Sequence, residues 1–365
     1  MVEIKEVTNL TPEERKRKNE LLSKPIKAIN PLSTKTVSDL LHAYSDMSVQ
    51  ARNMGKCLEV YENMLTDARR PVIFLGLAGP LIAGGLREVI RSMVDLGLVD
   101  VIVSTGAIMY QDVYQARGYN HYMGTPNSND AELRDLYIDR IYDTYVDEEK
   151  FIETDTWIGD FASSLEPRGY SSREFMQLLG KQLNDEKSIV ATAAKKGVPI
   201  FIPAINDSSI GIGLTSYYRW AKLNEKPRMY IDSIRDNYEL TQIVVKYRHT
   251  AAIYVAGGVP KNFINDSVVM GYVFNVDTGG HLYAFQLTTD SPHWGGLSGS
   301  TLEEATSWGK ISKKATRATA YVDPMVSLPL IVTSVIQDGL YKNRNRLEML
   351  WKDDELLSIK EAGQP

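Results

Sequence analysis

Short apolar runs rich in β-branched residues recur along the chain, with helical patterns between them. Runs of this length and composition are typical of strands buried on both faces of a sheet. Strands that alternate with helices form parallel sheets, because a parallel pairing needs a long crossover connection. The sequence therefore predicts an α/β fold around a mostly parallel sheet. The expected strands cover residues 71–76, 99–105, 199–203, 251–256 and 281–287.

Helical periodicity and helix-start signals fill the segments between these strands. The capping-box pattern occurs as Ser-x-x-Glu at Ser171 and as Thr-x-x-Glu at Thr301, and it satisfies free N–H groups in the first turn of a helix. The second pattern places Lys310 near the end of a short helix. Helices are expected over residues 36–67, 81–96, 171–197, 230–247, 263–271 and 326–342, and a last short strand over 320–323.

Two segments stand outside this alternation. Residues 1–30 are polar, and the charge run over 12–20 predicts a solvated helix or a mobile arm. Residues 110–165 are rich in Tyr and Asp and lack clear periodicity, which predicts a long insertion that forms a lid or an oligomer contact. We expect residues 1–68 to form an N-terminal arm and helical extension, packed on a single domain of residues 69–365.

Composition and charge exclude several classes of function. The 365 residues carry a formal net charge of −5, which gives no electrostatic reason to expect nucleic acid or an anionic membrane as a partner. The single cysteine, Cys57, rules out an intramolecular disulfide. The five histidines lack the spacing of zinc ligands, so no metal is expected. Without a signal-peptide pattern or an apolar run of bilayer length, a cytoplasmic protein is expected.

Glycine, serine and aspartate follow the expected strands. In open α/β sheets, ligands bind beyond the carboxyl ends of the strands, where glycine lets the backbone approach a phosphate and a carboxylate holds a ribose hydroxyl. Neither Gly-x-Gly-x-x-Gly nor a P-loop pattern is present. Each glycine alone is more often a turn residue, whereas the set together favours a nucleotide site. The set comprises residues 76–85, 104–107, 204–211, 257–258 and Asp323.

The run Ser307-Trp-Gly-Lys310 offers a lysine for imine chemistry. A nucleophilic lysine must be neutral, so its free pKa of about 10.4 has to fall through desolvation or a neighbouring cation. Trp308 is placed to wall such a site, and Glu304, nearly two helical turns upstream, is placed to bind an ammonium group or move a proton. The alternative is a surface lysine at a helix C-terminus, where the helix dipole favours it.

The chain resembles the deoxyhypusine synthase family, in its bacterial deoxyhypusine synthase-like branch. The resemblance extends from about Gln50 to about Val335 and rests on the order and spacing of its landmarks. These are Gln50-Ala-Arg-Asn-Met-Gly-Lys, Val72-Ile-Phe-Leu-Gly, Val99-Asp-Val-Ile-Val-Ser-Thr-Gly, Pro203-Ala-Ile-Asn-Asp-Ser-Ser-Ile-Gly, Gly257-Gly-Val-Pro-Lys, Glu304-Ala-Thr-Ser-Trp-Gly-Lys-Ile and Tyr321-Val-Asp.

This resemblance implies a doubly wound, Rossmann-like fold that binds NAD, usually as a homotetramer with sites at dimer interfaces. It also implies a reaction. NAD takes a hydride from an amine-bearing carbon of spermidine, and a lysine captures the resulting butylimine and releases diaminopropane. An acceptor amine then displaces the lysine, and the hydride returns. The acceptor is a protein lysine in deoxyhypusine synthase and putrescine in the related homospermidine synthases.

The resemblance also implies roles for single residues. Lys310 falls on the imine-forming lysine, and Glu304 and Trp308 fall on positions of the catalytic and substrate pocket. The positions that contact NAD fall on Thr105, Gly106, Asp207, Gly257, Gly258, Thr289, Ser298 and Asp323.

Several substrate positions depart from the family. The pocket histidine falls on Asn262, and two amine-binding aspartates fall on Ile212 and Leu297. These changes remove anchors for a multiply charged amine, so spermidine is not expected in its usual pose. His293 or His121 is the candidate replacement for the proton carrier, and a structural role is the alternative for each.

Three functions follow from these patterns. The first is an NAD-dependent amine transferase that moves an aminobutyl or similar group from a polyamine to a small amine, with a homospermidine-type product. The second is the same chemistry on a protein lysine. The third is a non-catalytic NAD-binding regulatory subunit, which the lost aspartates favour and the retained Lys310 opposes.

Overall fold

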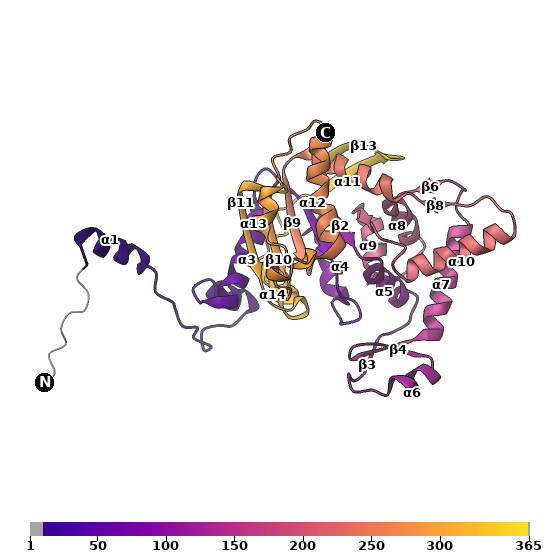
Figure 1. Cartoon of the computed structure of the whole chain (residues 1–365), viewed down its shortest axis with the longest axis horizontal. Helices are drawn as coiled ribbons and strands as arrows, with labels where there is room; N and C mark the ends of the chain where they lie inside the picture. The colour runs from indigo at the N-terminus through magenta and orange to yellow at the C-terminus, as the bar shows by residue number, and fades with distance from the viewer. Residues whose placement is uncertain (1–9, 364–365) are drawn as a thin grey trace.

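A six-stranded parallel sheet forms the centre of the molecule (Figure 1). The structure, a computed structural model, describes residues 10–363. The strand order β11-β10-β9-β1-β2-β7 places the first strand in the middle, so the chain winds to one edge and then to the other. The α/β, doubly wound, Rossmann-like fold is therefore confirmed. The strands are β1 (Val72–Leu77), β2 (Val101–Ser104), β7 (Ile200–Phe201), β9 (Thr250–Val255), β10 (His281–Leu287) and β11 (Ile311–Ala320).

Alternate residues of the central strands point to opposite faces, and helices cover both faces. In β1, Val72 and Phe74 belong to one apolar cluster, while Ile73 and Leu75 belong to the other. Because both faces are buried, these strands are apolar along their whole length, and the sequence therefore shows them as short apolar runs. The first cluster includes residues of α11 (Ser233–Tyr247), α12 (Gly258–Val273) and α13 (Leu302–Ser307). The second includes residues of α3 (Val49–Thr66), α4 (Arg87–Asp95), α5 (Gly106–Ala116), α9 (Ile189–Lys196) and α14 (Pro324–Gln337).

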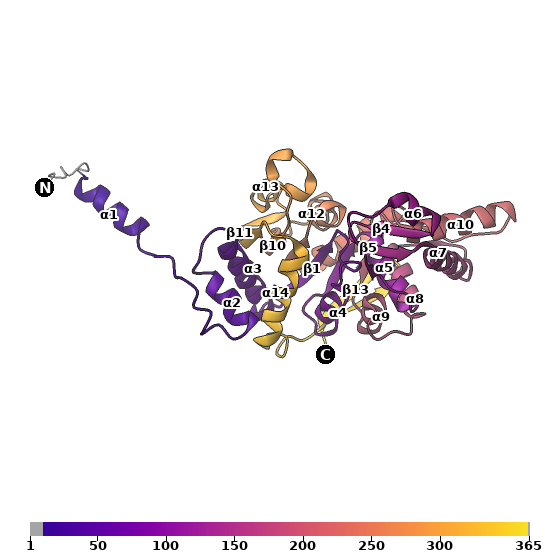
Figure 2. The same ribbon diagram turned by 90° about the horizontal axis from the view of Figure 1, so that it is seen from below.

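The N-terminal segment projects from this body. Helix α1 (Pro12–Leu21) has no buried side chain and stands away from the rest of the chain in both views (Figures 1 and 2). The charge run therefore forms an exposed helix. The single helix expected over 36–67 is wrong, since the chain forms α2 (Val37–Tyr44) and then α3. In the turn between these helices, Gly55 of α3 lies close to Ser45. A Cβ atom at position 55 would sit 2.6 Å from the Ser45 nitrogen, so this turn requires glycine there.

The start of the insertion expected over residues 110–165 is wrong, because residues 110–116 belong to the buried helix α5. The rest of the expected segment includes a small lobe beside the sheet. After α5 the chain forms a three-stranded antiparallel sheet with a short helix, and this lobe lies at the lower right of Figure 1. Its role as a lid or oligomer contact stays a prediction. The elements are β3 (Tyr122–Met123), α6 (Asp130–Asp135), β4 (Ile138–Ile141) and β5 (Thr144–Asp147), followed by α7 (Glu148–Ser163).

Some elements differ from the sequence prediction. The helix expected over 171–197 is two helices, α8 (Ser172–Gly180) and α9, because Ser188 caps a new helix by accepting a hydrogen bond from the Ala191 N–H. The last strand, expected over 320–323, ends rather than begins at Ala320. The strand observed there, β11, is an edge strand with polar residues, so it lacks the apolar run that predicts a buried strand. The elements not foreseen are β6 (Gly169–Tyr170), α10 (Ser209–Leu223), β8 (Tyr230–Ile231), β12 (Leu347–Lys352) and β13 (Glu355–Glu361).

No helix within residues 10–363 combines the length and the apolar character that a membrane crossing requires.

Candidate active site

The carboxyl ends of five strands lie at the same level of the sheet. Leu77 of β1 pairs with Ser104 of β2 and with Val255 of β9. Leu287 of β10 pairs with Val255 and with Ala320 of β11. Residues that directly follow these strands therefore lie along one edge, and the strand order reverses between β1 and β9, where α/β sheets open a binding crevice. The predicted cofactor residues that follow these strands are Thr105, Gly106, Gly257, Gly258, Thr289 and Asp323.

Gly257 and Gly258 make close backbone contacts with Ser298. The Gly258 N–H donates to Ser298 Oγ at 3.0 Å. A Cβ atom on Gly257 would lie 2.5 Å from the Ser298 Cα atom, and Gly258 has a φ of +61°, which favours glycine. Gln286 holds this contact by donating to the carbonyl groups of Ala256 and Ser298. The structure therefore brings these three predicted residues together.

Thr105, Gly106 and Asp207 lie together in the same way. Gly106 begins α5, and a Cβ atom on it would collide with the Ser208 side chain. Ser208 is the N-cap of α10, and Asp207 precedes it with an exposed side chain. The ends of β2 and β7 thus meet through two helix N-termini.

The N-terminus of α5 is suited to an anion. Its N-cap residue, Thr105, forms no side-chain hydrogen bond to the first turn, whereas in α12 the Gly258 N–H already donates to Ser298 Oγ. Free first-turn N–H groups carry the positive end of the helix dipole and bind phosphate groups. Asp323 lies at the same edge, exposed, where it caps α14 by accepting from the Met325 N–H at 2.9 Å.

Lys310 lies in the turn between α13 and β11. Its Nζ atom is 3.1 Å from Asp266 Oδ1 and donates to Asn262 Oδ1 at 3.3 Å. The Trp308 ring centroid is 5.4 Å from the same atom. The side chain is 15% exposed, so Lys310 is a partly buried lysine with polar partners and not a freely solvated one. Gly309, with a φ of +72°, allows the tight turn that aims it there.

Asp266 was not among the residues predicted from the sequence. It lies four residues after Asn262 on α12, so both side chains share one helix face, and Asn262 Nδ2 donates to Asp266 Oδ2 at 2.8 Å. The spacing of four residues was the signal in the sequence that could have placed Asp266 beside Asn262.

Lys261 is a second lysine that sequence reasoning missed. It is 1% exposed, and its Nζ atom donates to Gln286 Oε1 at 3.0 Å and to the Ser300 carbonyl at 2.5 Å. Burial lowers the pKa of Lys261 to about 8, with opposing contributions from the charges of Glu304 and Lys310.

Other predicted substrate residues line the open side of this pocket. Glu304 is exposed, Trp308 is 64% exposed and Leu297 is 40% exposed. Such exposure of large apolar side chains leaves this side of the pocket open in a single chain.

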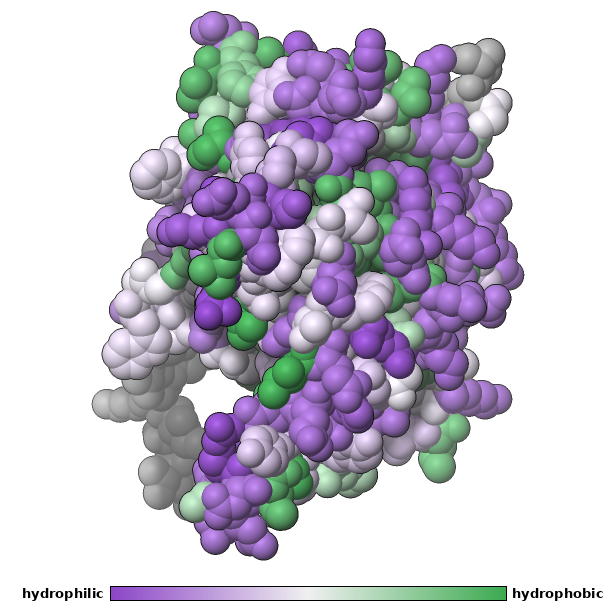
Figure 3. Space-filling view, turned by 90° about the vertical axis from the view of Figure 1, so that its right-hand side faces the viewer, coloured by the Kyte–Doolittle hydropathy of each residue, from purple (hydrophilic) through white to green (hydrophobic). Residues whose placement is uncertain are grey.

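Ile212 does not join Lys310 within one chain. It is 58% exposed on α10, which follows β7, whereas Lys310 precedes β11 at the opposite edge of the sheet. Five strand spacings separate those edges by roughly 24 Å. Figure 3 shows the α10 end of the molecule as a mostly hydrophilic surface with separate apolar patches.

The two histidines considered as proton carriers have other contacts, and neither bonds to Lys310. His293 is exposed, bonds to Ser291 Oγ and packs on the Trp294 ring. Burial lowers the pKa of His121 to about 4, and its ring packs against Tyr114 near the end of α5. Both positions favour the structural alternative.

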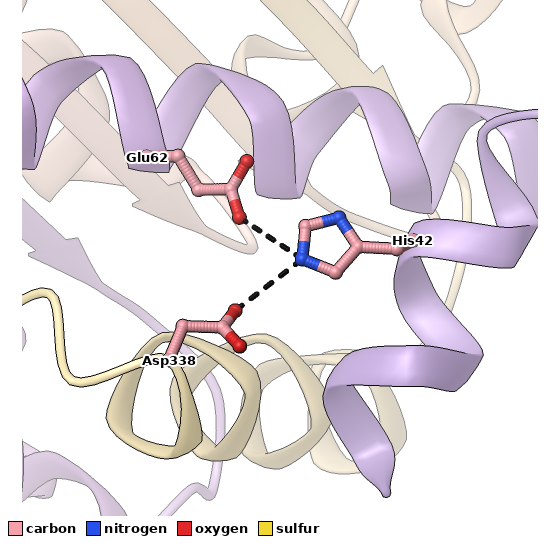
Figure 4. Close-up of side chains that lie close together, drawn as sticks. All are labelled: His42, Glu62 and Asp338. Atoms are coloured by element: carbon pink, nitrogen blue, oxygen red, sulfur yellow. Dashed lines mark hydrogen bonds and ion pairs between the residues drawn. The ribbon is translucent and has the colours of Figure 1, made fainter. Parts of the chain in front are cut away.

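A separate cluster joins three outer helices (Figure 4). His42 Nε2 of α2 lies 3.4 Å from Glu62 Oε1 of α3 and 3.3 Å from Asp338 Oδ2 at the end of α14. The three ligand atoms lie within 4.8 Å of one another, and this is the one such group in the described part of the chain. Because α14 runs away from the carboxyl edge over 14 residues, the cluster lies roughly 20 Å from that edge. These contacts of the His42 ring link the three helices.

The family model of deoxyhypusine synthase matches residues 39–335. The chain belongs to the deoxyhypusine synthase family. This family comprises transferases that move alkyl groups other than methyl, so the expected enzyme class is confirmed.

Relatives and a solved structure agree with this assignment. The chain is 40% identical over 332 residues to the probable deoxyhypusine synthase 2 of Methanosarcina acetivorans, covering 90% of this chain and 94% of the relative. It is 41% identical over 312 residues to the deoxyhypusine synthase-like protein of Coxiella burnetii, covering 84% and 87%. The crystal structure of a putative deoxyhypusine synthase from Entamoeba histolytica shares the fold, with a TM-score of 0.57 at 18% identity, covering 91% of this chain and all of that one.

Proposed function

We propose that the protein is an NAD-dependent transferase that moves an aminobutyl or similar group through an imine on Lys310. The supporting observation is the course of α12. The helix begins at Gly258 on the cofactor edge and carries Asn262 and Asp266 one and two turns further. The Lys310 ammonium that these residues hold therefore lies roughly 6–12 Å along the helix from that edge.

The carboxyl edge fits NAD. The uncapped N-terminus of α5 would hold the pyrophosphate, and Asp207 and Asp323 would accept hydrogen bonds from ribose hydroxyls. Glycine at 106 and 257 leaves room where a Cβ atom would collide. When bound, NAD would supply the hydride acceptor that turns an amine carbon into an imine carbon. Thr289 and Ser298 complete the proposed set of contacts.

Lys310 is the proposed nucleophile. Its Nζ atom would attack the imine carbon, and the Trp308 ring lies beside it, with its centroid 5.4 Å from Nζ. Glu304, whose charge acts on Lys261, is the proposed group for holding an ammonium group or moving a proton. We infer a polyamine donor and a small-amine acceptor, with a homospermidine-type product. The same chemistry on a protein lysine is the alternative, and a non-catalytic NAD-binding subunit is the third.

We further infer a cytoplasmic homotetramer with sites at dimer interfaces. Trp308 and Leu297 are exposed in a single chain, and Ile212 lies at the far end of the sheet. A second copy that brings its α10 end over the pocket would bury all three side chains.

Borohydride trapping tests the lysine imine. The protein is incubated with NAD and each of a panel of amines, then reduced, and adduct mass is measured on intact chains and on peptides. We expect an adduct on Lys310 that is lost in Lys310→Ala and kept in Lys313→Ala, which removes an exposed lysine nearby. No adduct with any amine would favour the non-catalytic alternative.

Product mass then distinguishes the acceptors. Adding putrescine or agmatine should give a small-molecule product with the acceptor's mass plus the transferred group. Modification of an added lysine-bearing protein, without such a product, would support the protein acceptor instead.

A further inference from the structure

Asp266 lies at the mouth of the lysine pocket. Its Oδ1 atom is 3.1 Å from Lys310 Nζ, and its Oδ2 atom accepts from Asn262 Nδ2 at 2.8 Å. The Asp266 side chain is 45% exposed, whereas the Lys310 side chain is 15% exposed. The carboxylate is therefore the solvent side of the pair, and an ionised carboxylate has about four acceptor positions, so it can take a further donor.

The charges around the pocket create a need for such an anchor. Lys261 and Lys310 are close enough for the charge of one to act on the other. A cationic amine that approaches two lysines is repelled unless a carboxylate faces it. Glu304 and Asp290 act on Lys261 through their charges, but Asp266 is the carboxylate that touches Lys310.

We propose that Asp266 binds an ammonium group of the amine substrate, taking it in exchange for Lys310. This assignment rests on the proposed function and deepens it, because it names the substrate class as amines with a second ammonium group beyond the reacting carbon. In the free protein Asp266 holds Lys310 against Asn262. In the complex the second ammonium group takes the carboxylate, and the Lys310 side chain is released toward the reacting carbon.

The transfer step that follows is balanced. The Lys310 ammonium first gives one proton to Glu304, the proposed proton carrier. The neutral Nζ atom then forms a bond to the iminium carbon of the substrate, and the bond from that carbon to the leaving amine breaks. The leaving amine takes the bond's electron pair and one proton from Nζ, so the lysine iminium keeps the positive charge. The ammonium group on Asp266 takes no part in bond making and stays as the fixed end of the transferred group.

The test compares a diamine with the matching amino alcohol. Putrescine and 4-aminobutan-1-ol share the reacting end and differ in the second ammonium group. For each, the half-saturating concentration for Lys310 adduct formation is measured with NAD present, in the native protein and in Asp266→Asn, which keeps the shape and removes the charge. Glu303→Gln is the matched control, because Glu303 pairs with Arg317 on the outside of α13.

We expect Asp266→Asn to raise the half-saturating concentration of the diamine about tenfold or more, the effect of losing one charged hydrogen bond. The value for the amino alcohol should change little, so the preference for the diamine is lost. Asp266→Glu should restore part of it, and Glu303→Gln should match the native protein. An unchanged preference in Asp266→Asn, or an equal loss in Glu303→Gln, would overturn the assignment.

Failure of the proposed function would look different. In that case the native protein would form no adduct with any amine. Titration calorimetry of both amines in the presence of NAD, which needs no turnover, would still show whether Asp266→Asn removes the diamine preference. Loss of that preference supports the anchor, and its persistence refutes it. Circular dichroism of each variant checks that the fold is retained.

Discussion

Backbone contacts of single glycines shape the proposed cofactor edge. The sequence suggested Gly257 and Gly258 as ligand-binding positions, and the structure supplies the reason for glycine there, which is the approach of Ser298. The local sequence identified Gly257, but its partner in this contact, Ser298, lies 41 residues further along the chain. Only the folded backbone shows why a Cβ atom is not tolerated.

Gly257→Ala should weaken NAD binding at least tenfold and destabilise the fold by ~1–3 kcal/mol, because the new methyl group forces Ser298 away. The dissociation constant for NAD and the urea unfolding midpoint measure the two effects. Gly296→Ala is the control, since that position has nothing within 4 Å of an added Cβ atom. Equal behaviour of the two variants would contradict the proposed role of this contact.

Lys261 makes stability depend on pH. In the unfolded chain its amine keeps its proton up to about pH 10.5, whereas burial lowers the pKa of Lys261 in the folded chain to about 8. Between these values the unfolded chain binds more protons, so stability rises with pH. Below the folded pKa the cost of burying the charge is fully present.

Lys261→Met should remove this slope. We expect the stability of the native protein relative to the variant to rise by ~3 kcal/mol between about pH 8 and about pH 10.5. Urea unfolding across that range measures it, with exposed Lys313→Met as the control. A constant difference across the range would show that Lys261 is not buried as a titrating amine.

At the scale of elements, ion pairs attach the C-terminal segment to the sheet. Asp100, just before β2, pairs with Arg70 at 2.8 Å and with Arg344 at 2.7 Å, and it accepts the Ile73 N–H. Burial raises the pKa of Asp100, but the two guanidinium groups outweigh it and hold the pKa below its usual value. These partners come from two parts of the sequence, both distant from Asp100, so no local pattern predicts the cluster.

Asp100→Asn should destabilise the protein by ~3–5 kcal/mol, because it leaves two buried guanidinium groups without their counter-charge. The free energy of unfolding in urea measures the loss. Asp143→Asn, at an exposed position of the insertion, should stay within ~0.5 kcal/mol of the native protein. A similarly small change at Asp100 would refute the structural role given to this cluster.

At the scale of the whole molecule, a single chain leaves the proposed pocket open. Ile212 and Lys310 lie at opposite ends of the sheet, so the substrate positions implied by the family resemblance are not assembled in one copy. The exposed α1 and the insertion also extend beyond the body (Figures 1 and 2). The division into residues 1–68 and 69–365 stays a prediction, although α3 packs into the main core.

If sites are shared between copies, two inactive variants should complement each other. Lys310→Ala removes the nucleophile, and Ile212→Arg places a cation where a second copy would meet the amine. Co-expressed, random pairing in dimers should restore roughly a quarter of the native sites, measured as borohydride-trapped adduct per chain. Copurification through different tags confirms mixed assembly. Mixed assemblies without any recovery would mean that each chain carries a complete site.

The sequence by itself determined the parallel α/β sheet, the ligand edge and the family. Buried strands are apolar throughout, and glycine and aspartate at their ends are local signals that can be recognised in the sequence alone. The edge strand β11, the hairpin β12–β13 and the broken helices lacked such signals, because their residues are half exposed or capped by turns.

Only the tertiary structure decided which side chains surround Lys310. It placed Asp266 beside the amine, buried Lys261 and left Ile212 at the far end of the sheet. Burial and charge pairing arise from elements far apart in the chain, and neither is encoded by the residue type alone.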